Sequence, residues 1–376
     1  MPDNETRLSN LLDKRSASNS YRSINLAASQ LIDFSSNDYL GLARSESLKA
    51  NILKAYTESA SSKNGSTGSR LLTGTSSILE ATEHELTQIF ETKAGLLFSS
   101  GYMANLAFFS SVPQKDDTIL YDELSHACIK DGCRLSLARK FPFRHNDLNQ
   151  LEQKLSKAEG NIYIACESVY SMDGDFAPLE RLVELAQQYG AKLVVDEAHS
   201  TGSFGKGGAG LVNALGLREK VYAAIHTFGK GMGVHGAFIS GSKTLREFLI
   251  NFARPFIYTT APSDFECISI SQAFRFLEKN QSLQQDLQAR IALFQTLAHG
   301  KLPLIQSSSS IQAILVPGNS KIKQMSQSMY DQGFDVRPIL SPTVKASEER
   351  IRICLHTYNS QEEITKLVST LTTYLS

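Results

Sequence analysis

Short apolar segments alternate with helix-like segments through the middle of the chain. Buried strands are predicted at NIYIACES (161–168) and KLVVDEAHS (192–200), and LERLVELAQQYGA (179–191) between them has apolar residues at helical spacing. Further strand-like runs follow at AAIHTFGK (223–230) and GAFISG (236–241). Apolar strands separated by helices form a mostly parallel sheet with helices on both faces, so we expect an α/β fold.

The length of the chain, 376 residues, is enough for two or three domains or lobes. We expect a large domain over residues 41–264 that contains the sheet, and a smaller C-terminal α/β domain over residues 265–376. The N-terminal segment, residues 1–40, is expected to pack with the small domain.

Charge and composition bear on the class of partner. The 38 Lys and Arg residues balance 38 Asp and Glu residues, so neither nucleic acid nor an anionic membrane is an expected partner. No apolar run reaches the length of a membrane span, and the start, MPDNETRLSNLLDKRS, lacks the apolar region of a signal peptide. The five cysteines are scattered and never form a C-x-x-C pair, which favours free thiols and a cytoplasmic location.

Polar side chains follow the predicted strands at the points where the strands end. Asp196 and His199 follow one strand, and Thr227 and Lys230 follow the next. His126 follows an upstream strand-like segment, DTILYDELSHAC. The segment after YIACES contributes Glu167, Ser171 and Asp173. Because ligands bind at the carboxyl ends of strands in such sheets, we expect these side chains to share one edge.

An anion-binding site is predicted beside this group of side chains. The apolar run in GLLFSSGYMAN (95–105) breaks at Gly101 into a helix start, where free backbone N–H groups can bind an anion. Pyridoxal 5′-phosphate needs a lysine amine for its aldehyde, an anion for its ring nitrogen, N–H groups for its phosphate and a flat group over its ring. Asp196 suits the ring nitrogen, since a buried carboxylate is costly unless it is paired. The glycines around Lys230 would let the backbone pass close to such a cofactor.

Other interpretations of the same residues fit less well. The sequence DEAH (196–199) also names a class of nucleic-acid helicases, but the P-loop that such proteins need is missing from the sequence. Asp196, His199 and His126 could be metal ligands, but no further acidic or His cluster completes a shell, so no metal is expected. Cys128 and Cys133 have no partner pair, and such a pair is more often two core cysteines than a zinc site.

Several motifs together resemble the α-oxoamine synthase group of fold-type I pyridoxal-phosphate enzymes. The resemblance runs from about residue 30 to about residue 357. The segments that carry it are FSSNDYLGL (34–42), SSGYMAN (99–105), LSHACIKDG (124–132), FRHND (143–147), ESVYSMDGDFAPL (167–179), VDEAHSTGSFG (195–205) and TFGKGMGVHGA (227–237). The resemblance implies the architecture of fold-type I transferases, with a large cofactor-binding domain and a small α/β domain.

The resemblance also implies a role for each matching residue. Lys230 would bond to the cofactor, Asp196 would pair with the ring nitrogen, and His199 would bond to the ring 3-hydroxyl. His126 would stack on the ring and lie beside the substrate. The remaining cofactor contacts fall on Gly101, Tyr102, Ser171 and Thr227. His145 and His235 are interpreted as structural residues.

On the substrate side, Asn37 and Arg352 would bind the amino-acid carboxylate. Arg22 and Thr343 match positions that touch substrate in part of the group. Arg350, two residues earlier, has the same chemistry, so Arg352 could instead be a surface arginine.

Enzymes of this group join an amino acid to an acyl thioester with loss of CO2. The TFGKGMGVHGAF and NFARPFIYTTAPSDF (251–265) stretches most resemble the branch that makes 8-amino-7-oxononanoate from L-alanine and a pimeloyl thioester in biotin synthesis. The alternatives are other branches: glycine C-acetyltransferase, 5-aminolevulinate synthase, serine palmitoyltransferase or a signalling-ketone synthase. A protein of a different class, which binds ligands and has lost the chemistry, is a further alternative.

The acyl substrate and the assembly follow from the same resemblance. Coenzyme A or acyl carrier protein would carry the acyl group. At 340–347 the chain reads LSPTVKAS where the biotin branch commonly reads RPPTVP-x-G, a departure that bears on recognition of the acyl chain. A homodimer is implied, in which SSKNGSTGSRLLTG (61–74) reaches the neighbour's site.

Overall fold

The computed structural model describes residues 3–24, 30–59, 63–341 and 343–375. These residues form two compact units. The larger unit comprises Asn37–Ser171 and Phe176–Asp286. The smaller unit comprises the described residues of Met1–Ser36, Met172–Asp175 and Leu287–Ser376. The domain boundaries expected after residues 40 and 264 stay predictions.

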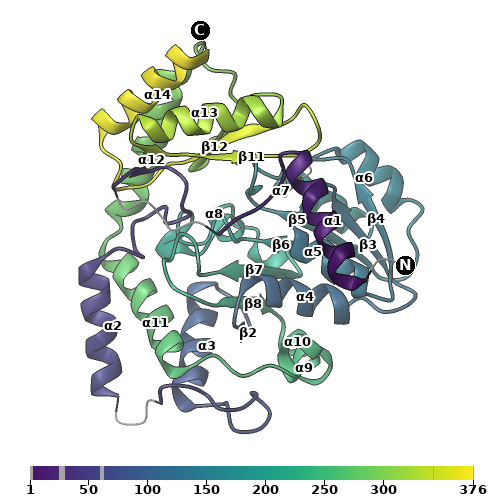
Figure 1. The fold of residues 1–376 in the computed structure, drawn as a ribbon. Coiled ribbons are helices and arrows are strands. Elements are labelled where there is room, and N and C mark those ends of the chain that lie inside the picture. The colour runs from purple at the N-terminus through teal and green to yellow at the C-terminus, as the bar shows by residue number, and fades with distance from the viewer. Residues whose placement is uncertain (1–2, 25–29, 60–62, 342, 376) are drawn as a thin grey trace. The chain divides into compact units, whose positions relative to one another are not determined.

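The larger unit is built on a seven-stranded sheet with the order β2-β8-β7-β6-β5-β3-β4 (Figure 1). The strands are β2 (Ala94–Phe98), β3 (Thr118–Asp122), β4 (Arg139–Phe143), β5 (Ile162–Glu167), β6 (Lys192–Asp196), β7 (Ala223–Thr227) and β8 (Ala237–Gly241). The five neighbouring strands β7, β6, β5, β3 and β4 are parallel to one another. Strand β8 runs antiparallel to both of its neighbours, β2 and β7. The predicted α/β fold with a mostly parallel sheet is confirmed.

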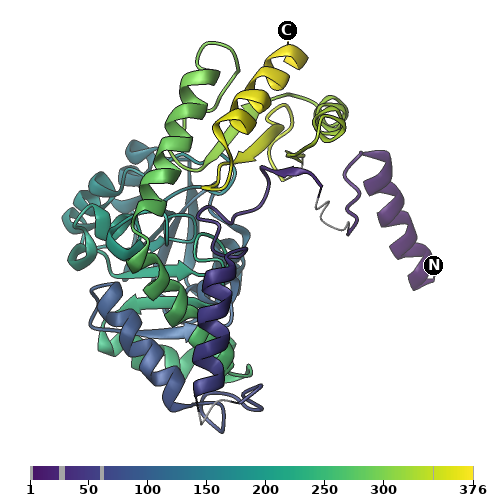
Figure 2. The same cartoon turned by 90° about the vertical axis from the view of Figure 1, so that its left-hand side faces the viewer.

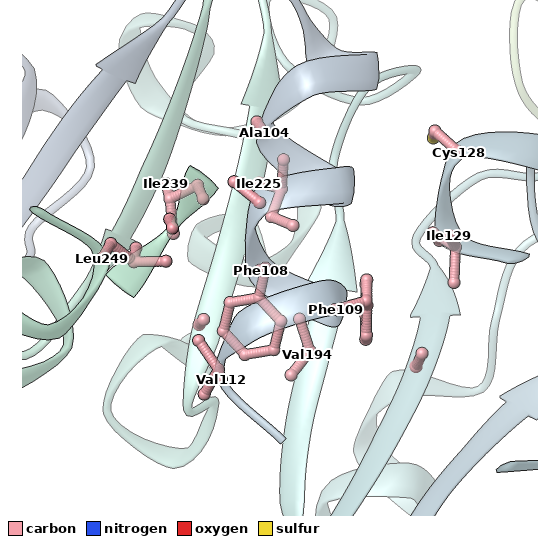
Figure 3. Close-up of a cluster of buried hydrophobic side chains, with 14 of the residues drawn as sticks. Ala104, Phe108, Phe109, Val112, Cys128, Ile129, Val194, Ile225, Ile239 and Leu249 are labelled. Carbon is pink, nitrogen blue, oxygen red and sulfur yellow. The ribbon is translucent and has the colours of Figure 1, made fainter. Parts of the chain in front are cut away.

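Both faces of this sheet are buried, because side chains alternate between two apolar cores along each strand. On β6, Val194 belongs to one core and Val195 to the other. The first core includes Phe108 and Ala104 of helix α4 (Gly101–Ser111), which face Val194 and Ile225 of the strands (Figure 3). The second core includes Leu182 of helix α7 (Leu179–Gln188). Helices therefore cover both faces of the sheet.

Local chemistry marks the ends of two helices of the larger unit. Helix α7 ends shortly before Gly190, whose φ of 63° lies in the left-handed region that glycine adopts easily. Helix α11 (Asp264–Lys279) begins with a capping box between Ser263 and Glu266. The remaining elements are α2 (Glu46–Glu58), α3 (Ser77–Ile89), α5 (Ala127–Leu135), α6 (Leu148–Leu155), α8 (Leu211–Ala214), α9 (Lys243–Phe252), α10 (Arg254–Ile257) and two 3-10 turns, η1 (Lys206–Gly208) and η2 (Arg218–Lys220).

The smaller unit contains a three-stranded antiparallel sheet with the order β11-β12-β9. Its strands are β9 (Ile311–Leu315), β11 (Arg337–Ile339) and β12 (Arg350–Cys354). A short parallel pair joins β1 (Ile32–Asp33) to β10 (Phe334–Asp335). The helices of this unit are α1 (Asn4–Ala17), α13 (Asn319–Asp331) and α14 (Gln361–Leu375), and α13 and α14 pack beside the sheet (Figure 2). Helix α12 (Ser282–Ala298) begins in the larger unit and continues into the smaller one.

Membrane-spanning character is missing from the part of the chain that the structure describes. Within those residues, no helix combines the length and the apolar character needed to cross a bilayer.

Candidate active site

The carboxyl ends of β5, β6 and β7 bring the predicted residues of the larger unit to one edge of the sheet. Glu167 ends β5 in register with Asp196, which ends β6. Asp196 is in register with Ile225 of β7, and Thr227 ends that strand two residues later. Glu167, Asp196 and Thr227 therefore lie at one edge, as parallel pairing requires. Asp173, which was expected at the same edge, belongs to the smaller unit instead, where it pairs with Arg350.

Asp196 is a buried carboxylate held by two hydrogen bonds. Its side chain is 5% exposed. The side-chain amide of Asn105 donates to Oδ2 at 2.7 Å, and the backbone N–H of Ala198 donates to Oδ1 at 2.9 Å. Two donors orient the carboxylate. Sequence reasoning missed Asn105, although it follows Gly101 by one turn of α4 in the quoted GYMAN motif.

Glu167 adds a second buried carboxyl group beside Asp196. Burial, reinforced by the negative charge of Asp196, raises the pKa of Glu167 to about 8. The Glu167 carboxyl accepts a hydrogen bond of 2.6 Å from the backbone N–H of His126. Glu167 therefore holds the start of α5, from which the His126 side chain projects.

His126 occupies the N-cap position of α5, and its side chain is exposed. The backbone N–H of Cys128 donates to its Nδ1 atom at 3.2 Å. This bond fixes the ring at the helix start, so an exposed flat face is available at the sheet edge. The exposure argues against a core histidine at this position.

Cys128 and Cys133 are buried in the first core. Burial raises the pKa of the Cys128 thiol far above its usual range and raises the pKa of Cys133 to about 12. Both thiols are free and protonated, as the interpretation as core cysteines expects.

Lys230 and His199 contact each other directly. The Lys230 amine lies 2.9 Å from Nε2 of His199, and the His199 ring is buried at 4% exposure. On its other side, His199 Nδ1 lies 2.7 Å from the hydroxyl of Tyr39. The Tyr39 hydroxyl donates in turn to Oδ1 of Asn37 at 3.0 Å. Tyr39 belongs to the FSSNDYLGL motif, but the sequence pattern did not predict a role for it.

A seat for a phosphate group is formed by Thr227 and the start of α4. The Thr227 hydroxyl oxygen is buried and has no hydrogen-bond partner among the described residues. A Cβ atom at Gly101 would overlap this oxygen, so glycine is needed where the helix begins. An unpartnered buried hydroxyl beside free N–H groups at a helix start fits the phosphate of a bound cofactor.

The other two predicted cofactor residues flank this region in the larger unit. Tyr102 lies in the first turn of α4, where its backbone N–H has no partner within the helix. Its side chain is turned away, because the Tyr102 hydroxyl bonds to Asp131 of α5. Ser171 follows β5 and is buried at 7% exposure.

Within the smaller unit, Arg22 and Thr343 meet across 321 residues of sequence. The Arg22 guanidinium donates to the Thr343 hydroxyl at 3.3 Å. Arg352 of β12 is half-buried, and its Nη1 atom lies 3.0 Å from Sγ of Cys354. The structure therefore brings together two of the predicted substrate residues that belong to this unit.

Arg350, the alternative to Arg352, lies in surroundings typical of a residue that stabilises the fold. It is 4% exposed and forms an ion pair with Asp173. Its Nε atom donates to the backbone oxygen of Glu348 at 2.8 Å. These contacts commit the guanidinium of Arg350 to the smaller unit itself.

The two histidines interpreted as structural lie in the larger unit. Nδ1 of His145 is 3.0 Å from a carboxylate oxygen of Asp122, which is fully buried. His235 lines a cavity together with Leu42, Val234 and Phe265.

Comparison with known proteins gives the family of the chain. A sequence model of the family described as aminotransferase class I and II matches residues 29–371. The chain is similar to 8-amino-7-oxononanoate synthase of Emericella nidulans, with 38% identity over 94% of this chain and 92% of that protein. These shares mean that the likeness extends over nearly the whole of both proteins.

Solved structures agree with the sequence comparison. A serine palmitoyltransferase from S. paucimobilis with bound PLP and myriocin has a TM-score of 0.90 and 25% identity, and the match covers 99% of this chain and 98% of that one. An 8-amino-7-oxononanoate synthase from Francisella tularensis has a TM-score of 0.80 and 28% identity, covering 93% of this chain and 98% of that one. From the arrangement of the strand ends and from these matches, the chain belongs to the aminotransferase class I and II family.

Proposed function

We propose that this chain uses pyridoxal 5′-phosphate to join L-alanine to a pimeloyl thioester, with loss of CO2, and so makes 8-amino-7-oxononanoate for biotin synthesis. The observation that carries the proposal is the contact between Lys230 and His199, beside the buried carboxylate of Asp196, in a chain of this family. The choice of substrates is supported by the 38% identical relative, which is named for this product.

The residues of the larger unit fit the cofactor in chemistry. Lys230 offers the amine that the aldehyde needs, and Asp196 offers the anion that the ring nitrogen needs. The unpartnered Thr227 hydroxyl and the N–H groups of Gly101 and Tyr102 would hold the phosphate. When bound, the cofactor withdraws electrons from the α-carbon of the amino acid.

Asp196 would keep the proton on the ring nitrogen. Its carboxylate is already oriented by Asn105 and by the N–H of Ala198, so no rearrangement is needed during the reaction. A charge fixed in a buried place acts more strongly than the same charge in water, because water does not screen it. His126 and Ser171 would complete the surroundings of the ring.

Lys230 would move the proton of the amino acid. Once its amine is free, Nζ can accept the proton from the α-carbon and return it after CO2 has left. Nε2 of His199, at 2.9 Å from Nζ, would hold the amine in position before the cofactor binds, and would donate to the ring oxygen of the cofactor once it is bound. The same lysine amine therefore handles this proton in both steps of the reaction.

The amino-acid carboxylate would bind to Arg352 and Asn37. A guanidinium binds a carboxylate through two parallel N–H bonds, which fixes both the position and the orientation of the substrate. Arg22 and Thr343, which bond to each other, would contribute to the substrate site from the smaller unit.

The assembly and the place of action belong to the same proposal. The enzyme would be a cytoplasmic homodimer that takes its acyl group from coenzyme A or acyl carrier protein. Free, buried thiols at all five cysteines support a reducing compartment. The segment expected to reach the neighbour's site is 61–74, of which residues 61 and 62 lie outside the described residues. Light scattering that finds a fully active monomer would contradict the dimer.

The deciding assay offers purified enzyme, loaded with the cofactor, a panel of substrates. Pimeloyl, acetyl, succinyl and palmitoyl thioesters are each combined with alanine, glycine and serine, and thiol release and product mass are measured. We expect the highest kcat/KM for pimeloyl thioester with alanine, and a product with the mass of 8-amino-7-oxononanoate. A clear preference for a succinyl or long-chain acyl group would refute the biotin assignment, and no condensation with any pair would refute the enzyme class.

A further inference from the structure

A chain of hydrogen bonds links Asn37 to Lys230 through two buried side chains. Tyr39 is fully buried, and its hydroxyl lies 3.0 Å from Oδ1 of Asn37 and 2.7 Å from Nδ1 of His199. Nε2 of His199 lies 2.9 Å from the Lys230 amine. Every distance lies in the range of an ordinary hydrogen bond.

The Tyr39 hydroxyl has one proton, and both Oδ1 of Asn37 and Nδ1 of His199 can accept it. In the structure, the hydroxyl donates to Oδ1 of Asn37. Nδ1 of His199 must then carry a hydrogen and donate to the Tyr39 oxygen, because two lone pairs cannot bond to each other. This leaves the lone pair on Nε2, which accepts from the Lys230 amine.

The opposite arrangement has a different result at Lys230. If the Tyr39 hydroxyl donates to Nδ1 of His199, the ring hydrogen lies on Nε2 and Nε2 becomes a donor. That form suits an oxygen acceptor such as the ring oxygen of the cofactor. The direction of one hydroxyl proton therefore decides whether His199 accepts or donates at the atom that faces Lys230.

We propose that Tyr39 is a positioning residue that couples the Asn37 amide to the protonation pattern of His199. A ligand with a carboxylate, such as the amino acid, that turns the Asn37 oxygen away from Tyr39 would send the hydroxyl proton to Nδ1 and move the ring hydrogen to Nε2. His199 then becomes a donor at Nε2 when the amino acid arrives. This step rests on the proposed function only for the identity of the carboxylate ligand.

The first test reads the ring directly in the full-length chain freed of cofactor. With 15N-labelled histidine, NMR distinguishes a ring with hydrogen on Nδ1 from one with hydrogen on Nε2, and a His199→Asn variant assigns the signal. We expect the Nδ1–H form in the wild-type chain and the Nε2–H form in Asn37→Ala, which removes the competing acceptor. The same form in both proteins would overturn the proposal.

The second test uses Tyr39→Phe, which removes the hydroxyl and leaves a ring of the same shape in the buried space. We expect the Kd for pyridoxal 5′-phosphate and the KM for alanine each to rise about tenfold, the scale of one lost buried hydrogen bond. Tyr163→Phe is the matched control, because Tyr163 is a buried tyrosine of β5 in the first core. We expect it to change both constants less than twofold.

The outcomes separate this proposal from the proposed function. If Tyr39→Phe leaves both constants within twofold of the wild type, or if Tyr163→Phe matches its losses, Tyr39 has no positioning role. The NMR form and the cofactor affinity need no acyl substrate, so both can be measured even if the condensation with a pimeloyl thioester fails. If Tyr39→Phe fails to fold, as judged by circular dichroism, the NMR result for Asn37→Ala still tests whether Asn37 controls the protonation pattern of His199.

Discussion

Glu167 and Asp196 are direct partners across β5 and β6, so two buried carboxyl groups end neighbouring strands side by side. Asp196 accepts two hydrogen bonds, one from a side-chain amide and one from a backbone N–H. Glu167 accepts one bond, from the N–H of His126, and its pKa is raised to about 8. Because its pKa is raised to this value, Glu167 keeps a proton at neutral pH beside the Asp196 side chain.

The pH dependence of stability should report the proton on Glu167. Because the pKa of this group rises from about 4.5 to about 8 on folding, the folded chain holds an additional proton between these values. The contribution of Glu167 to the free energy of unfolding therefore falls as pH rises through this range. Glu197, buried and with a pKa raised to about 7, contributes in the same direction.

Glu167→Gln should reduce this fall. In urea unfolding of the chain without cofactor, we expect the loss of unfolding free energy between pH 6 and pH 8.5 to be smaller than in the wild type by at least about 1 kcal/mol. The exposed carboxylate of Glu159 gives the control, and Glu159→Gln should leave the pH dependence unchanged. An unchanged fall in Glu167→Gln would mean that Glu167 is already ionised at neutral pH.

Asp196→Asn should keep the fold and lose the chemistry. Oδ1 of Asn105 is buried and has no hydrogen-bond partner within the part of the chain that the structure describes, so after a flip of its amide Asn105 can accept a bond from the new amide at position 196. A neutral amide cannot hold a proton on the ring nitrogen, so we expect kcat to fall at least about 100-fold. Steady-state assays and the Tm check this, with the exposed Glu184→Gln as control. Near-normal turnover would rule out the role of Asp196.

Much of this edge of the sheet could be predicted because buried parallel strands have a distinct sequence pattern. Each of β5, β6 and β7 reads as a short apolar run, and the polar residues that follow must come to the same edge. Asn105 and Tyr39 could not be found in this way, because their importance lies in contacts with residues 91 and 160 positions away. Only the folded chain shows these contacts.

The glycines near Lys230 show the limit of a local argument. The sequence suggested that they let the backbone approach the cofactor. The structure gives a different reason for two of them. A Cβ atom at Gly231 would press on the backbone oxygen of Thr201, and one at Gly233, with a φ of 65°, would overlap the backbone of Ala43. Close packing of the chain against itself thus requires these glycines, and no local pattern reveals such packing.

The Thr227 hydroxyl should contribute to cofactor affinity. Thr227→Val has the same shape but no hydroxyl, so we expect the Kd for pyridoxal 5′-phosphate to rise about tenfold. Thr227→Ser keeps the oxygen and should stay within twofold of the wild type. Equilibrium dialysis of the chain freed of cofactor measures both values. Equal affinities for the Val and Ser variants would show that the buried oxygen does not bind the phosphate.

Arg350 and Arg352 are two residues apart on β12, and parallel substitutions should separate their roles. Arg350 is buried in an ion pair with Asp173, so Arg350→Lys should lower the Tm and leave the KM for alanine unchanged. Arg352→Lys should leave the Tm unchanged and raise the KM for alanine at least about tenfold, because an ammonium cannot form the two parallel bonds of a guanidinium. The visible absorption of the bound cofactor should persist in both variants. If the KM rises with Arg350→Lys instead, the amino-acid carboxylate binds to Arg350, and the assignment of Arg352 fails.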